Sequence, residues 1–127
     1  MRFLSTRVHG AVDYLTGALL IISPWLFGFA DGGTAQWVPV VLGASVILIA
    51  LFTAYEWGVV KIIPIAAHLG IDCATGLLLL VSPWLFGFAG LVWLPHVVIG
   101  AFEILVSLIT RTHPGIDASR QAQGTAA

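Results

Sequence analysis

The sequence predicts an all-α membrane protein with four transmembrane helices, built from two parallel two-helix repeats. Composition is the first reason, because 59% of the 127 residues are apolar and 9% are charged, with a mean hydropathy of +1.03. A surface of that composition suits lipid better than water. Segmentation is the second reason, since the apolar segments 8–29, 37–55, 62–88 and 91–110 are each near the ~20 residues that cross ~30 Å of hydrocarbon. An internal repeat is the third.

The repeat is visible in the eight letters SPWLFGFA, which occur at residues 23–30 and again at 82–89, 59 positions apart. Over residues 9–30 and 68–89, 14 of 22 positions are identical. A repeat of this kind defines the folding unit. Because each unit holds an even number of spans, both copies should insert the same way up, related by a pseudo-two-fold axis along the membrane normal.

The first helix of each repeat is expected to end at the SPW motif. Pro24 lacks a backbone N–H and should kink or end the helix, and the Ser23 hydroxyl is placed to bond a carbonyl that the proline frees. The aromatic run that follows suits a membrane interface better than a quinone- or lipid-binding box. The structural motif therefore comprises Ser23, Pro24, Trp25, Ser82, Pro83 and Trp84.

The second helix of each repeat opens on a Trp followed two residues later by a Pro, at Trp37 and again at Trp93. Small residues follow at matching positions, Gly43 and Gly100, which we expect to permit close helix packing. Gly17 and Gly76, on the first helices, are expected to let those two helices approach each other.

The basic residues predict the orientation. In a four-span arrangement all of them fall on one side, at Arg2, Arg7, Lys61, Arg111 and Arg120. Since cytoplasmic loops are enriched in Lys and Arg, both termini are predicted to be cytoplasmic, in the cell membrane. The first segment is interpreted as a span rather than a cleaved signal peptide, because its motif returns in mid-chain. We expect a cytoplasmic N-terminus at 1–7, a first repeat at 8–55, a cytoplasmic linker at 56–61, a second repeat at 62–110 and a disordered cytoplasmic tail at 111–127.

Polar residues near the cytoplasmic end of the first helices are the candidate functional cluster. His9 and Asp13, like His68 and Asp72, are four residues apart and so share a helix face. Ionisable residues inside a membrane point to function, because an unpaired charge there is unfavourable by several kcal/mol. Three interpretations remain open: a structural hydrogen-bonded cluster with Thr16, Thr75 or a helix N-terminus as further partners, a proton or ion path, and a metal or haem site.

Glu103 joins this candidate cluster and departs from the repeat symmetry, since the matching residue is Val46. It lies on a polar helix face with His96 and Ser107. Its carboxyl either reaches the His–Asp pairs and is stabilised by a protonated His, stays protonated and bonds across a helix interface, or exchanges a proton during transport.

The chain resembles the SPW repeat family of small bacterial and archaeal membrane proteins, which is named for a Ser-Pro-Trp motif in the first of two membrane helices. The two copies of the motif carry the match, and two repeats cover residues 8–110. The resemblance implies a multipass membrane protein and brings no activity, cofactor or catalytic residue with it.

The function that the sequence favours is that of a non-enzymatic membrane module that packs in the bilayer with copies of itself or with other membrane subunits. The alternatives are a small proton- or ion-coupled channel or carrier that uses His9, Asp13, His68, Asp72 and Glu103, and a metal- or haem-binding redox subunit. No catalytic residues, cofactor or assigned metal site are predicted. The net charge of −1 and the lack of basic clusters argue against nucleic acid as a partner, and the lone Cys73 excludes an internal disulfide.

Overall fold

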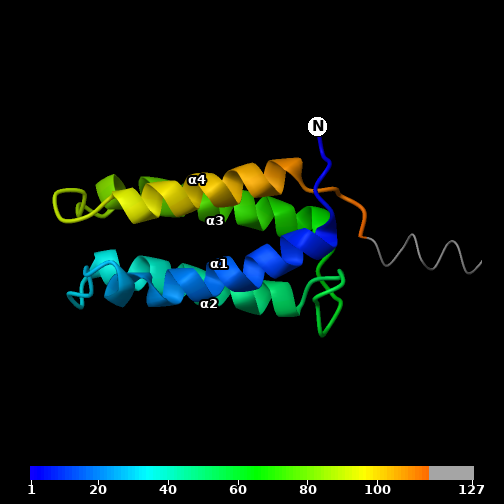
Figure 1. Cartoon of the computed structure of the whole chain (residues 1–127), viewed down its shortest axis with the longest axis horizontal. Helices are drawn as coiled ribbons and strands as arrows, with labels where there is room; N and C mark the ends of the chain where they lie inside the picture. The colour runs from blue at the N-terminus through cyan, green and yellow to red at the C-terminus, as the bar shows by residue number, and fades with distance from the viewer. Residues whose placement is uncertain (115–127) are drawn as a thin grey trace, which may run out of the picture.

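A computed structural model describes residues 1–114, and those residues form four α-helices in two antiparallel pairs (Figure 1). In chain order the helices are α1 (Thr6–Leu26), α2 (Thr34–Leu51), α3 (Ile65–Leu85) and α4 (Leu94–Ile109). α1 packs along α2, α3 packs along α4, and the two pairs lie one on the other with fewer close contacts between them. The all-helical prediction is confirmed. The predicted tail begins within the described part of the chain, but its residues 115–127 lie outside it.

Two of the helices, α2 and α3, are long and apolar enough to cross a membrane, and α4 is a shorter apolar helix of 16 residues. α1 matches α3 in length at 21 residues but carries Arg7, His9 and Asp13 in its first half. Large apolar side chains of all four helices face outwards, as with Leu15, Val41, Leu77 and Leu105. This outer surface is that of a membrane protein.

Paired glycines bring the helices of each pair together. A Cβ atom on Gly43 would lie 2.6 Å from the carbonyl oxygen of Gly17, and a Cβ on Gly100 would lie 2.6 Å from that of Gly76. Only glycine permits this approach of two backbones. Gly17 and Gly76 thus pack within their own helix pairs, whereas the sequence suggested that they would meet between α1 and α3.

In the Ser-Pro step of the motif, the serine hydroxyl replaces the helix hydrogen bond that the proline cannot make. Pro24 has no N–H to donate to the carbonyl of Leu20, four residues back. The Ser23 hydroxyl donates to that carbonyl instead, at 2.8 Å, and in the second copy the Ser82 hydroxyl bonds Leu79 at 2.7 Å. α1 therefore continues through Pro24 and ends two residues later, at Leu26.

The rest of the motif is a helix C-cap. Gly28 has φ 75°, the left-handed conformation that closes many helices. The backbone N–H of Phe29 then donates to the Pro24 carbonyl at 2.8 Å, and Phe29 turns inwards. The second copy has the same features at Gly87 and Phe88. The residues SPWLFGF thus form the last turn of a helix, in which serine bonds the free carbonyl, followed by a glycine turn and a buried aromatic ring.

At the opposite end of the bundle, two joints connect the helix pairs. The segment before α3 forms a backbone bridge between Ile63 and Thr53, just after α2. The N-terminal segment before α1 forms the corresponding bridge between Leu4 and Thr110, just after α4. Hydrogen bonds of 2.8–2.9 Å support both joints. Each first helix therefore starts beside the end of the second helix of the other pair.

Candidate functional site

The four residues of the predicted His–Asp pairs meet between the two helix pairs, near the end of the bundle that holds the joints. His9 and Asp13 come from α1, and His68 and Asp72 come from α3. Both His Nε2 atoms lie among the carboxylates: His9 Nε2 is 3.1 Å from Asp13 and 2.9 Å from Asp72, and His68 Nε2 is 3.0 Å and 2.9 Å from the same two residues. None of the four is more than 5% exposed. We call them the His–Asp cluster.

The other ring nitrogen of each histidine is held by a threonine of the opposite helix pair. His9 Nδ1 lies 2.7 Å from the Thr110 hydroxyl oxygen, and His68 Nδ1 lies 2.7 Å from that of Thr53. Each hydroxyl also bonds a carbonyl of its own helix, at 2.6 Å and 2.7 Å. Since a hydroxyl has one hydrogen, which the carbonyl takes, the threonine oxygen must accept from Nδ1–H. Both rings are therefore fixed with Nδ1 protonated and Nε2 turned to the carboxylates.

Tyr55, in the connection between α2 and α3, supplies a further donor. Its hydroxyl donates to Asp13 Oδ2 at 2.8 Å, and its ring lies 5.3 Å from that of His68. Tyr55 is fully buried. Burial, together with the neighbouring Asp13 carboxylate, raises the pKa of Tyr55 above its ordinary value. The hydroxyl therefore keeps its proton and remains a donor.

Glu103 lies beside the His–Asp cluster without bonding to it. A small cavity separates them. It is lined by Glu103, Asp13 and Asp72 among others, and its volume is about 10 Å³. That is room for about one water. Within the described residues, Glu103 Oε1 is buried and has no hydrogen-bond partner. Val46, at the matching position of the first half, lines the same cavity.

An apolar layer follows the cluster along the interface between the helix pairs. Leu20 and Leu79, which are 1% and 0% exposed, pack there with Ile99. Beyond this layer the rings of Phe29 and Phe88 lie 5.1 Å and 4.9 Å from the ring of His96. The interface is thus polar at one end, apolar in the middle and aromatic at the other end.

His96 is a further polar residue that is buried in the interface, away from the cluster. Its Nε2 donates to the Ala35 carbonyl at 3.0 Å, and its Nδ1 is buried with no partner in the described part of the chain. The shared helix face of His96 and Glu103 therefore does not bring them into one site. They lie seven residues apart on α4, ~10 Å at 1.5 Å per residue.

Sequence reasoning placed the histidines and aspartates together but missed the hydroxyl groups around them. Thr75, suggested as a partner of the aspartates, bonds backbone carbonyls of its own helix. The partners are instead Thr53, Thr110 and Tyr55. The two threonines occupy matching positions in the two halves, which is the signal that could have identified them.

Chemically, the cluster offers two imidazoles and two carboxylates whose ligand atoms all lie within 4.8 Å of one another. Such a set can bind protons in a closed network or hold a metal ion. Its burial leaves no room for an organic substrate.

Comparison with known proteins agrees with the motif. A family model for the SPW repeat domain matches residues 7–110, which include α2, α3, α4 and all of α1 except its first residue, Thr6. No curated protein and no solved structure matches the chain significantly. With its two motif copies at helix ends and the match extending over the whole bundle, the chain belongs to the SPW repeat domain family.

Proposed function

We propose that the protein is a non-enzymatic module of the cell membrane, made of two parallel two-helix repeats that cross the bilayer four times and associate with further copies. The His–Asp cluster fastens the two repeats together. One observation carries this proposal: the His and Asp side chains of the cluster contact each other across the two helix pairs, and an apolar layer closes the interface next to them.

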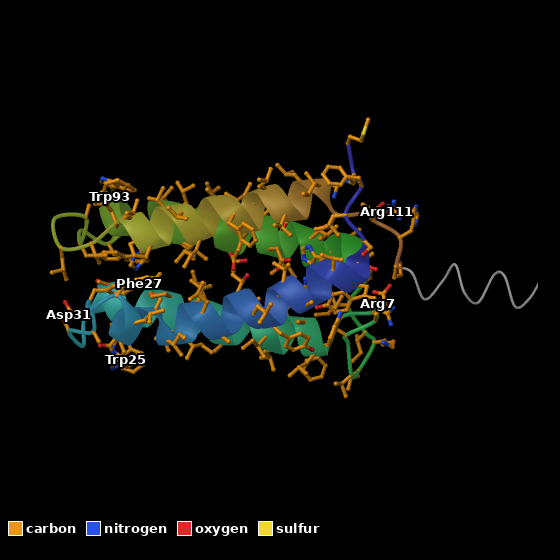
Figure 2. All side chains as sticks on the ribbon, viewed as in Figure 1. Arg7, Trp25, Phe27, Asp31, Trp93 and Arg111 are labelled. Carbon is orange, nitrogen blue, oxygen red and sulfur yellow. The ribbon has the colours of Figure 1, made fainter. Side chains whose placement is uncertain are left out.

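The distribution of side chains along the bundle supports cytoplasmic termini. Arg7 and Arg111 lie at the end that holds the joints, and Trp25 and Trp93 lie at the other end (Figure 2). Tryptophan favours the membrane interface, and basic residues favour the cytoplasmic side. The Trp25 side chain is about half exposed, as a ring in an interfacial belt would be.

The apolar layer argues against transport through a single copy. A proton that reached Glu103 would still meet Leu20, Leu79 and Ile99, which carry no group that could pass it on. Beyond them, His96 is enclosed by two phenylalanine rings, and the buried Ser23 and Ser82 hydroxyls donate to carbonyls of their own helices. We therefore rank a proton- or ion-coupled channel below the structural function.

Labelling of single cysteines in intact cells tests the topology. In a Cys73→Ser background, Asp31→Cys lies in the connection between α1 and α2 and Val59→Cys in the connection between α2 and α3, and both positions are exposed. A membrane-impermeant maleimide should label Asp31→Cys in whole cells and Val59→Cys only after lysis. Labelling of both in whole cells would contradict four spans with cytoplasmic termini.

Reconstitution into liposomes tests the function. Cross-linking should trap dimers or larger assemblies at lipid-to-protein ratios at which an unrelated four-span protein stays monomeric. The same vesicles should show no more proton leak than empty ones. A leak that Asp13→Asn abolishes would favour the channel, and a monomer at every ratio would overturn self-association.

A further inference from the structure

We propose that the His–Asp cluster is a binding site for one divalent transition-metal ion, with His9, Asp13, His68 and Asp72 as its protein ligands. The inference is independent of whether the protein self-associates or lets protons pass. It rests on four features of the site: the orientation of its imidazoles, the spacing of its ligand atoms, its unsatisfied atoms and its charge.

The first feature is the orientation of the imidazoles. Thr110 and Thr53 accept from Nδ1–H of His9 and His68, so the Nε2 atoms are the ones presented to the centre. A neutral Nε2 has a lone pair, which carboxylate oxygens at 2.9–3.1 Å would repel. Something positive must therefore lie between them, either protons or a metal ion. Histidines that ligate metals almost always donate their other N–H to such an acceptor.

The second feature is spacing. Asp72 presents one oxygen, Oδ2, to both Nε2 atoms at 2.9 Å, whereas Asp13 presents Oδ1 to His9 at 3.1 Å and Oδ2 to His68 at 3.0 Å. The ligand atoms that the four residues offer all lie within 4.8 Å of one another. Metal–nitrogen and metal–oxygen bonds are ~2.0–2.2 Å long, so two ligand atoms on opposite sides of one ion lie at most ~4.4 Å apart. Shifts of a few tenths of an ångström would complete the coordination.

The third feature is a pair of unsatisfied atoms at the site. His68 Nε2, on a residue with 0% exposure, has two oxygens within 3.0 Å but no hydrogen bond of good geometry. Glu103 Oε1 is also buried without a partner, across a cavity the size of one water. A metal ion would take the His68 lone pair, and a water ligand in the cavity would bond Glu103.

The fourth feature is charge. Two neutral imidazoles and two carboxylates carry a total charge of −2, which one divalent ion neutralises, and a buried site needs this balance. Nitrogen ligands select against Mg²⁺ and Ca²⁺, which prefer oxygen. The chemistry therefore points to a first-row transition metal such as Zn²⁺ or Co²⁺.

The test uses the full-length protein in detergent, stripped with a chelator and titrated with Co²⁺. We expect one ion per chain, with the visible absorption bands of Co²⁺ bound to nitrogen and oxygen, and displacement by Zn²⁺ but not by Mg²⁺. His68→Gln should weaken binding by about 100-fold or more. Thr110→Val, which removes only the acceptor for His9 Nδ1, should weaken it by about 10- to 100-fold.

Two histidines outside the cluster provide matched controls. His96→Gln changes a buried histidine and His113→Gln an exposed one, and both should leave the affinity unchanged. No binding to the wild-type protein at micromolar metal would overturn the proposal and show that protons alone fill the site. Equal binding to His68→Gln would overturn it too. If His68→Gln does not fold, X-ray absorption of the wild-type zinc form decides, because fewer than two imidazole ligands would refute the site.

Discussion

Replacing Tyr55 with Phe removes one hydroxyl that donates to the His–Asp cluster and leaves the aromatic ring of residue 55 in place. The lost bond is a 2.8 Å contact from a fully buried donor to the Asp13 carboxylate. A hydrogen bond to a charged group contributes about 1.5–3 kcal/mol. The ring can keep its contact with His68 at 5.3 Å. Tyr55→Phe should therefore lower the free energy of unfolding by about 1.5–3 kcal/mol, which shifts the unfolding equilibrium by roughly 10- to 100-fold.

Tyr14→Phe is the matched control. The Tyr14 hydroxyl donates at the same distance, 2.8 Å, but to the backbone carbonyl of Trp57 at an exposed site. Its loss should lower the free energy by about 1 kcal/mol or less. Unfolding in mixed detergent micelles, followed by tryptophan fluorescence, measures both variants. Equal effects of the two substitutions would refute the reasoning that burial and charge make the Tyr55 bond strong.

The same pair of proteins makes a prediction about pH. The pKa of Tyr55 is raised in the folded protein, so the unfolded chain loses this proton first as pH rises. The contribution of the hydroxyl should be constant below about pH 10, the ordinary tyrosine pKa, and should decline above it. Comparing wild type with Tyr55→Phe at each pH isolates this contribution. A difference in stability that already falls between about pH 6 and 8 would contradict it.

Four further substitutions test the packing by the same unfolding assay. Gly43→Ala places a methyl group 2.6 Å from a backbone oxygen of α1 and should be destabilising by about 1–3 kcal/mol. Gly70→Ala, on α3 with nothing within 4 Å, should instead be stabilising by up to about 1 kcal/mol through helix propensity; the opposite order would refute the close approach. Ser23→Ala leaves the buried Leu20 carbonyl without its donor and should lower stability by about 1–3 kcal/mol. Glu103→Leu removes a carboxyl whose Oε1 atom is buried without a partner among the described residues and should raise the stability of the metal-free protein by about 1–3 kcal/mol; a loss of stability there would show that Glu103 has a partner.

The helices and the membership of the His–Asp cluster were predictable because they depend on local patterns. Apolar runs fix the helices, and the four-residue spacing puts His9 beside Asp13 on one face. The repeat then suggests that the second pair meets the first. The role of Ser23 was also predictable, since its neighbour Pro24 has no N–H and leaves a carbonyl one turn back without a donor.

The partners of the cluster were not predictable, because they come from distant parts of the chain. Thr110 is 101 residues from His9, and Tyr55 is 42 residues from Asp13. The role of Gly17 was misjudged for a geometric reason. At 3.6 residues per turn, eight residues beyond His9 the helix face has drifted by ~80°. Gly17 therefore faces α2, while His9 faces α3.

The two joints differ in how the chain connects them. At one joint α2 is covalently linked to α3, whereas at the other the N-terminal segment is held beside α4 by hydrogen bonds from its backbone and from the Arg2 side chain. The geometry of the two joints is nevertheless the same. A circularly permuted chain that began at α3 and ended after α2 would form the same helix pairs and the same cluster. The four helices thus pack in a closed ring, and this packing does not depend on which of the two first helices, α1 or α3, comes first in the chain.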